Sequence, residues 1–234
     1  CGSTHIENLQ KFVKEKGLDV GFAYDGDADR CLAVDENGVL IDGDQVMAAC
    51  GLDLKGKGKL PGDAVVATVM SNLGLHVFAK ENGLKVECTD VGDRNVLERM
   101  VEKGYVLGGE QSGHIIFSKY ATTGDGILTS LMIMEVLTEK KQTLGTLAGE
   151  VKIYPQLLQN VRVTDKKTAL ENEAVQNAIK AAAEALGSDG RILVRESGTE
   201  PVIRVMVEAS TDEICTEYVN QVVNVMKEQG LVQE

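Results

Sequence analysis

The chain has 234 residues, of which 43% are hydrophobic and 26% charged, a composition typical of a folded globular protein. Acidic residues outnumber basic ones by 36 to 24, which gives a formal net charge of −12 at pH 7. This charge argues against nucleic acid and anionic membranes as partners, although a few arginines gathered at one site could still bind a small anion.

Nothing in the sequence predicts passage into or across a membrane. No apolar run approaches the roughly 20 residues that span a bilayer, and the first residues lack the basic and apolar pattern of a signal peptide. The chain has 5 cysteines, an odd number without any CxxC pair, which favours free thiols in a reducing compartment. We therefore expect a cytoplasmic protein.

The predicted elements begin with a helix that ends near Gly17, and a capping box of Thr4 and Glu7 marks its start. Two strands follow, "LDVGFAY" and "RCLAVD", on either side of the acidic segment "DGDADR", and "ENG" predicts a hairpin turn. A further helix is expected over 44–53, and the glycine- and lysine-rich segment 54–63 is typical of a linker.

Strands and helices then alternate along the chain. "AVVATVM", "LKVEC" and "YVLGG" are strand-like, and helical patterns separate them. The long apolar helix "GILTSLMIMEVLTEK" and a shorter helix near 143–150 complete this part. Such an order predicts an α/β domain with a largely parallel sheet.

The pattern changes after about residue 153. A strand, an amphipathic helix over 166–186, two strands and a last helix, opened by a capping box of Ser210 and Glu213, follow one another. This β-α-β-β-α order predicts a small α+β domain with an antiparallel sheet. The segment 151–155 before it is the expected hinge between domains.

The segment "DGDADR" places three aspartates, Asp25, Asp27 and Asp29, in alternation with small residues. Three carboxylates that converge on one point repel one another unless a cation neutralises them, and Mg²⁺ prefers carboxylate oxygens. A polar surface turn is one alternative. A calcium EF-hand is another, since Glu36 stands at position twelve of such a loop, but Arg30 replaces the required glycine and both flanks are strand-like.

The segment "GGEQSGH" follows a predicted strand, at the end of an α/β sheet where ligands bind. Glu110 and Ser112 can hydrogen-bond sugar hydroxyls, and His114 can bind a phosphate or move a proton. A glycine-rich turn without a binding role is the alternative.

The segment "RESGTEPVIR" joins the two last predicted strands. The backbone and hydroxyls of Ser197, Gly198 and Thr199 can cradle an anion, and Arg195 and Arg204 carry guanidinium groups that match phosphate. An ordinary hairpin loop is the alternative, but the paired arginines favour phosphate binding.

In this order, "DGDADR", "GEQSGH" and "RESGTEPVIRVMVE" resemble the metal, sugar and phosphate loops of the α-D-phosphohexomutase family, and the resemblance covers essentially the whole chain. It implies a truncated α/β second domain over 1–57, an α/β third domain over 58–152 and a small α+β fourth domain over 153–234. Within the family, Gln111 and "TTGDGILTSL" are most similar to the bacterial phosphoglucosamine mutases. These interconvert glucosamine 6-phosphate and glucosamine 1-phosphate on the route to UDP-N-acetylglucosamine and peptidoglycan.

The resemblance implies phosphoryl transfer through a phosphoserine and a bisphosphate intermediate, with Mg²⁺ held by Asp25, Asp27 and Asp29. It also implies catalytic roles for Arg30, beside the transferring phosphoryl group, and for His114, close to the reacting groups. The implied substrate-binding residues are Gly92 and Asp93 in "DVGDRN", Glu110, Ser112 and His114 in the sugar loop, and Arg195, Ser197, Gly198, Thr199 and Arg204 in the phosphate loop.

The family's nucleophilic serine lies in a "SASHN"-like motif of the first domain, and no Ser-His pair occurs in this chain. Family members are also about twice as long. We therefore expect a C-terminal fragment that lacks the first domain, binds metal and sugar phosphate weakly and does not turn over alone. Its expected partners are a phosphosugar and the missing N-terminal domain of the same protein, and the full-length protein could form an oligomer.

Three other functions stay open. A phosphomannomutase or phosphoglucomutase of the same family would share all three loops. A non-catalytic sugar-phosphate binding module would need the sugar and phosphate loops but not the three aspartates. A phosphatase would also use metal-bound aspartates, but the chain has no DxDxT-type start, because Arg30 follows Asp29.

Overall fold

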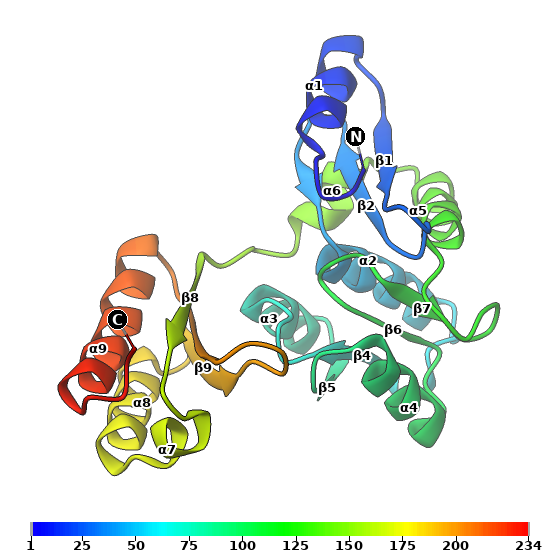
Figure 1. Ribbon diagram of the computed structural model, residues 1–234. Coiled ribbons are helices and arrows are strands. Elements are labelled where there is room, and N and C mark those ends of the chain that lie inside the picture. Colours follow the sequence, from blue (N-terminus) through cyan, green and yellow to red (C-terminus); the bar gives the residue numbers. More distant parts are fainter. Residues whose placement is uncertain (1, 234) are drawn as a thin grey trace. The chain divides into compact units, whose positions relative to one another are not determined.

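The computed structural model describes residues 2–233 and divides into two compact units, Cys1–Lys152 and Ile153–Glu234 (Figure 1). The predicted mixed α/β fold class, with a final antiparallel sheet, is confirmed. The predicted division into three domains stays a prediction. Among the described residues, every helix is too short or too polar to cross a membrane.

The first sheet of the N-terminal unit has three antiparallel strands in the order β1-β2-β3, and it holds the predicted hairpin. The helix α1 packs against it through Leu9 and Val13, whose side chains occupy the space above Gly21. The bounds are Glu7–Lys16 for α1, Val20–Tyr24 for β1, Cys31–Asp35 for β2 and Leu40–Ile41 for β3.

The second sheet has the order β5-β4-β6-β7, in which β4 pairs in parallel with β5 and β6, and β7 runs antiparallel to β6. A buried strand of small and β-branched residues, "AVVAT", forms its centre. The bounds are Ala64–Thr68 for β4, Lys85–Thr89 for β5, Leu107–Gly109 for β6, Ile115–Phe117 for β7, Leu73–Glu81 for α3, Asp93–Lys103 for α4, Gly126–Lys140 for α5 and Leu144–Gly149 for α6.

The helix α2, Gly43–Gly56, runs three residues into the segment 54–63 that was predicted to be a linker. The last three residues of that segment form the short 3₁₀ turn Pro61–Asp63. The start of α2 is fixed by a capping box of Asp42 and Gln45. Nine of its residues are buried, because it packs against both α5 and the second sheet. Packing therefore extended the helix past its glycine- and lysine-rich end, and the linker prediction was wrong for its first three residues.

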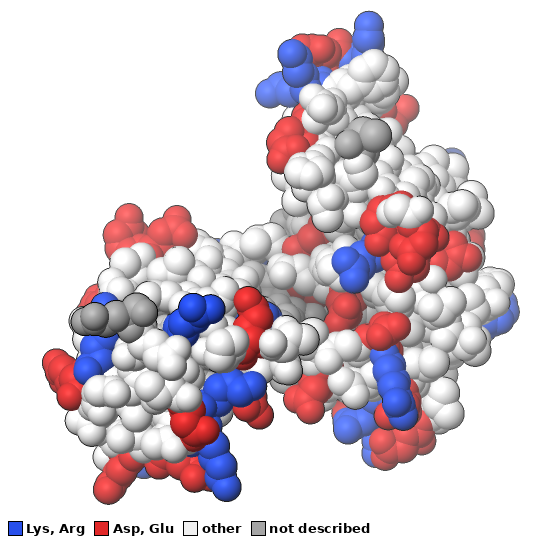
Figure 2. All heavy atoms as spheres, in the orientation of Figure 1, with Lys and Arg blue, Asp and Glu red and all other residues white. Residues whose placement is uncertain are grey.

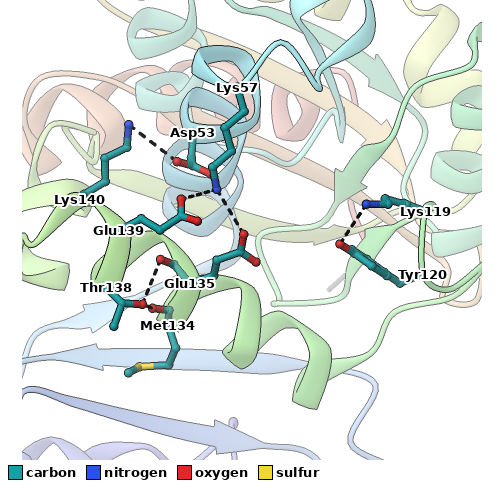
Figure 3. A network of polar contacts seen from close by, with 9 residues as sticks. All are labelled: Asp53, Lys57, Lys119, Tyr120, Met134, Glu135, Thr138, Glu139 and Lys140. Atoms are coloured by element: carbon teal, nitrogen blue, oxygen red, sulfur yellow. Dashed lines mark hydrogen bonds and ion pairs between the residues drawn. The ribbon is translucent and has the colours of Figure 1, made fainter.

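A polar network fixes the end of α2 against α5 (Figure 3). The ammonium group of Lys57 lies 2.7 Å from Asp53 and 3.3 Å from Glu135, and it also pairs with Glu139. Hydrogen bonds to these carboxylates, that to Asp53 above all, raise the pKa of Lys57. The second cation, Lys140, lies 3.7 Å from Asp53. The network thus joins the end of α2 to α5.

The C-terminal unit is an antiparallel sheet in the order β8-β10-β9, with α8 and α9 packed on it (Figure 1). Its core is the apolar cluster formed by the central strand and these two helices. The bounds are Gln156–Arg162 for β8, Lys166–Glu171 for α7, Glu173–Leu186 for α8, Arg191–Glu196 for β9, Val202–Glu208 for β10 and Asp212–Glu228 for α9.

Three helix boundaries differ from the sequence prediction. The segment 166–186 forms two helices, because Asn172 takes an extended conformation and its side chain caps α8. The helix α9 begins after Thr211, whose hydroxyl accepts the backbone N–H of Ile214, and not at a Ser210 capping box. The helix α1 has Ile6 at its N-cap and no side-chain cap, so the predicted capping box at its start was wrong.

Candidate active site

The loop between β1 and β2 brings its three aspartates together. Asp25, Asp27 and Asp29 each present one carboxylate oxygen, and the three oxygens lie within 4.8 Å of one another. The backbone curls tightly here, since Ala28 has φ of 59° and donates its N–H to the carbonyl of Asp25 at 3.3 Å. Figure 2 shows acidic side chains gathered at this place beside α5. The loop thus presents the converging carboxylates that its sequence predicts.

The protein itself supplies little compensation for this negative charge. Desolvation acts to raise the pKa of Asp25, but the backbone N–H of Arg30 and the contact with Asp29 lower it overall. Desolvation and the neighbouring Asp25 raise the pKa of Asp29. The guanidinium Nε of Arg30 lies 3.8 Å from Asp25, and the arginine side chain is 45% exposed. One arginine does not neutralise three carboxylates, so the loop is suited to a cation.

His114 lies directly against the aspartate loop. Its Nδ1 is 3.0 Å from Asp29 Oδ2, and its Nε2 accepts the backbone N–H of Gly124 at 3.0 Å. The residue is only 3% exposed and forms a β-bridge with Arg30. Two residues 85 positions apart are therefore joined, and both ring nitrogens have partners within the protein. A catalytic role for this histidine stays a prediction.

The predicted sugar loop contacts the predicted 92–93 loop. The carboxylate of Glu110 accepts the backbone N–H of Gly92 at 3.0 Å. Gly92 has φ of 128°, a conformation that residues with a side chain rarely adopt. Ser112 is exposed at the turn, and Asp93 is exposed at the first position of α4. The sugar loop and the 92–93 loop, about 18 residues apart in the chain, therefore lie together and present polar backbone and side-chain groups.

Asp42 is a site neighbour that the sequence did not reveal. The side-chain amide of Gln111 donates to Asp42 Oδ2 at 3.2 Å, and the carbonyl of Gln111 accepts the N–H of Gly43. Burial raises the pKa of Asp42. An alanine at Gly43 would place its Cβ 2.1 Å from the carbonyl of Glu110, so glycine is required there. The only sequence signal was the capping position of Asp42 before α2.

Glycines allow the aspartate and sugar loops to interlock. Gly113 has φ of 92° and accepts the N–H of Cys31, the first residue of β2. Gly126 donates its N–H to the carbonyl of Ala28 at 2.8 Å. The aspartate loop is thus held by backbone bonds from two later segments.

In the C-terminal unit, the predicted phosphate loop connects β9 and β10. Arg195 and Arg204 are directly opposite partners in the strand register. Like charges in this position destabilise a sheet unless an anion lies between them. The guanidinium of Arg204 donates to Ser197 Oγ at 3.4 Å and to Glu200 at 3.3 Å, while its buried Nε has no partner among the described residues. Ser197 is 1% exposed, so the base of the loop is buried.

Lys166 is the second site neighbour that sequence reasoning missed. It is the first residue of α7, and its ammonium group donates to the carbonyl of Ser197 at 2.7 Å and lies 3.5 Å from Glu196. Gly198 and Thr199 are exposed at the tip of the same loop. Lys166 stands about 30 positions before the motif, so no local pattern could link the two. The unit therefore gathers three cations around one Ser-Gly-Thr turn.

Two models of one protein family match the chain. Residues 42–154 match "Phosphoglucomutase/phosphomannomutase, alpha/beta/alpha domain III", and residues 158–225 match "Phosphoglucomutase/phosphomannomutase, C-terminal domain". The chain belongs to the phosphoglucomutase/phosphomannomutase family, the α-D-phosphohexomutases, which confirms the resemblance found in its sequence.

Within this family, the chain is similar in sequence to curated proteins of one kind, the phosphoglucosamine mutases. The phosphoglucosamine mutase of Lachnospira eligens is 59% identical over 230 residues, which are 98% of this chain and 51% of that protein. The phosphoglucosamine mutase of Bacillus cytotoxicus is 54% identical over 226 residues, 97% of this chain and 50% of that protein. The chain thus spans about half the length of the curated relatives it matches.

Solved structures share the fold. N-acetylphosphoglucosamine mutase of Aspergillus fumigatus, in complex with GlcNAc-6P and magnesium, aligns with a TM-score of 0.79 at 23% identity, over 98% of this chain and 53% of that one. A phosphoglucomutase/phosphomannomutase family protein of Burkholderia thailandensis aligns with a TM-score of 0.78 at 21% identity, over 97% of this chain and 50% of that one. At these identities the likeness concerns the fold.

Proposed function

We propose that the chain forms the C-terminal half of a phosphoglucosamine mutase, which interconverts glucosamine 6-phosphate and glucosamine 1-phosphate. The observation that carries this proposal is the 59% identity to a phosphoglucosamine mutase over nearly the whole chain. In the whole enzyme a phosphoserine would give its phosphoryl group to the sugar phosphate and recover the other one, which makes the enzyme an isomerase of amino-sugar metabolism.

The aspartate loop is the proposed Mg²⁺ site. Three carboxylate oxygens within 4.8 Å match the hard oxygen ligands that this ion takes, and no histidine or cysteine competes among them. Asp25, Asp27 and Asp29 would hold the ion, and Arg30 would face the phosphoryl group beside it. Bound Mg²⁺ would offset the negative charge of the transferring group.

The two other loops are the proposed substrate site. Glu110 and Ser112, with the backbone of Gly92 and with Asp93, would bind sugar hydroxyls. The loop between β9 and β10 would hold the phosphate that does not react. The guanidinium groups of its arginines suit this role because they donate two parallel hydrogen bonds to phosphate oxygens. The residues of this proposed phosphate site are Arg195, Ser197, Gly198, Thr199 and Arg204.

The remaining half of the enzyme would supply the nucleophilic serine. The N-terminal unit of this chain has a surface that is suited to contact that missing half. The strand β1 ends the order of its sheet, so within the described chain its outer edge pairs with no other strand. The adjacent helix α5 exposes Ile127, Leu131 and Met134 by 57%, 62% and 37%, spaced along one stripe. An open strand edge beside an apolar stripe is a surface for protein association. The proposed occupant is the N-terminal half of the same enzyme.

Incubation of the chain with glucosamine 6-phosphate, Mg²⁺ and a hexose bisphosphate tests the proposal, with ³¹P NMR as the readout. We expect binding of the sugar phosphate and no glucosamine 1-phosphate. Clear formation of glucosamine 1-phosphate by the chain alone would contradict the proposal that the nucleophilic serine belongs to the other half of the enzyme. Absence of binding even at millimolar sugar phosphate would contradict the substrate loops.

Two rivals predict other results in a full-length protein that contains this chain. A phosphomannomutase or phosphoglucomutase would prefer mannose or glucose phosphate over glucosamine phosphate. A non-catalytic binding module would keep its ligand affinity when Asp27→Asn is introduced, whereas a mutase should lose most of its rate.

A further inference from the structure

His114 occupies an unusual position for a residue that exchanges protons with a substrate. The side chain is 3% exposed and lies against the aspartate loop, and each ring nitrogen is 3.0 Å from one protein atom. One partner is the carboxylate of Asp29, and the other is a backbone N–H. Neither ring nitrogen is left to contact another molecule while these bonds are made.

The backbone partner determines where the ring proton lies. The N–H of Gly124 can only donate, so Nε2 of His114 must be the unprotonated acceptor. The proton of the neutral ring is then on Nδ1, which donates to Asp29 Oδ2. This bond fixes the rotation of the Asp29 carboxylate, because one of its two oxygens is tied to the ring.

The segment "TTGDG" is shaped to support this ring. An alanine at Gly124 would place its Cβ 2.5 Å from the imidazole, so only glycine lets the backbone approach Nε2. Two residues later, the N–H of Gly126 bonds to the carbonyl of Ala28 inside the aspartate loop, and a Cβ there would lie 2.6 Å from the carbonyl of Arg30. The segment therefore supports the loop twice, through the ring and through its backbone.

We propose that His114, supported by Gly124, is a positioning residue that orients Asp29 for the cation and does not transfer protons to the substrate. The inference rests on the proposed function of the aspartate loop as a metal site. It extends that function, since it gives a role to the histidine and to the "TTGDG" segment together. Partners that orient a metal ligand in this way typically contribute about 10- to 100-fold to metal affinity.

A matched pair of substitutions separates the two ring nitrogens. In His114→Asn the amide nitrogen can take the place of Nδ1 and still donate to Asp29. In His114→Gln the longer side chain brings its amide to the place of Nε2 and leaves Asp29 without its donor. We expect His114→Asn to bind Mn²⁺, used as a probe for Mg²⁺, within about threefold of the wild-type chain, and His114→Gln to bind it about 10- to 100-fold more weakly.

Mn²⁺ titrations followed by electron paramagnetic resonance, on chains shown to be folded by circular dichroism, give the outcome. Equal affinities of His114→Gln and wild type, or equal losses in both variants, would overturn the inference. In an Asp29→Asn background, His114→Gln should cause no further loss. If the wild-type chain binds no Mn²⁺, the proposed metal site fails first and this inference fails with it.

A measurement on the unmodified chain avoids any folding defect of a variant. Long-range ¹H–¹⁵N correlation spectra of the imidazole rings distinguish the two neutral tautomers. We expect His114 to carry its proton on Nδ1, with Nε2 as the unprotonated nitrogen. A proton on Nε2 would contradict the bond from Gly124 and overturn the inference.

Discussion

Replacement of Arg204 by methionine should separate anion binding from folding in the C-terminal unit. Arg204 faces Arg195 directly across the β9–β10 pair. Among the described residues its one ion pair is with Glu200, at 3.3 Å, and that pair is partly exposed. The substitution removes the repulsion, the ion pair and the 3.4 Å hydrogen bond to Ser197. It also removes the buried Nε that lacks a partner among the described atoms. These changes act in opposite directions on the free energy of unfolding.

The magnitudes follow from the two environments. An opposed pair of like charges costs about 0.2–1 kcal/mol, and an exposed ion pair contributes about 0–1 kcal/mol. The net change in unfolding free energy for Arg204→Met should therefore stay within about 1 kcal/mol. A hydrogen bond from a charged donor to a bound phosphate contributes about 1.5–3 kcal/mol, which corresponds to a loss of about 10- to 150-fold in affinity.

The assay is a titration of the whole chain with inorganic phosphate and with glucosamine 6-phosphate, followed by NMR, together with urea unfolding in a phosphate-free buffer. Lys180→Met is the matched control, because it removes a positive charge from α8 whose only ion pair within residues 2–233 is an exposed one with Glu184. Phosphate affinity of Arg204→Met equal to that of the wild type would refute the reasoning. An equal loss in Lys180→Met would show that net charge, and not the loop, holds the anion.

Three further results are expected. Gly113→Ala should lower the unfolding free energy by about 2 kcal/mol or more, since its φ of 92° disfavours a side chain and the Cβ would lie 2.4 Å from the carbonyl of Cys31. Gly26→Ala, whose Cβ meets no atom within 4 Å, should leave the thermal midpoint nearly unchanged, and equal midpoints for both variants would contradict this account. Burial raises the pKa of Asp42 above its ordinary value of 3.8, so its contribution to stability is present below that pH and is lost as the pH rises through the folded value. Asp42→Asn should thus gain stability relative to wild type as the pH rises above 3.8 in urea unfolding, and a constant difference would exclude the effect. Leu131→Lys, at a 62% exposed position, should unfold like the wild-type chain but weaken association with the N-terminal half of a relative in a pull-down, and unchanged association would move the interface elsewhere.

The sequence predicted those parts of the fold that local chemistry determines. The strands on either side of "DGDADR", the convergence of its carboxylates and the final antiparallel sheet follow from alternation, turn residues and element order. The parallel pairing of β4 with its two neighbours likewise follows from the alternation of strands and helices.

Long-range contacts account for what the sequence did not show. Packing on both faces extended α2 beyond its apolar segment, and Asn172 divided a continuous amphipathic pattern into two helices because its side chain caps the second one. Lys166 and Asp42 join their sites from other elements, so no spacing within a motif reveals them. The bond between His114 and Asp29 connects residues 85 positions apart, and only the folded chain brings them together.

A chimera tests the central claim most directly. The N-terminal half of the Lachnospira eligens relative, joined to this chain in place of its own 59% identical half, would restore a complete enzyme. We expect this chimera to convert glucosamine 6-phosphate to glucosamine 1-phosphate in the presence of Mg²⁺, measured by ³¹P NMR. It should do so in preference to glucose and mannose phosphates, and its Asp27→Asn variant should lose most of the rate. A folded chimera that binds sugar phosphate without turnover, or that prefers another hexose phosphate, would contradict the proposed function.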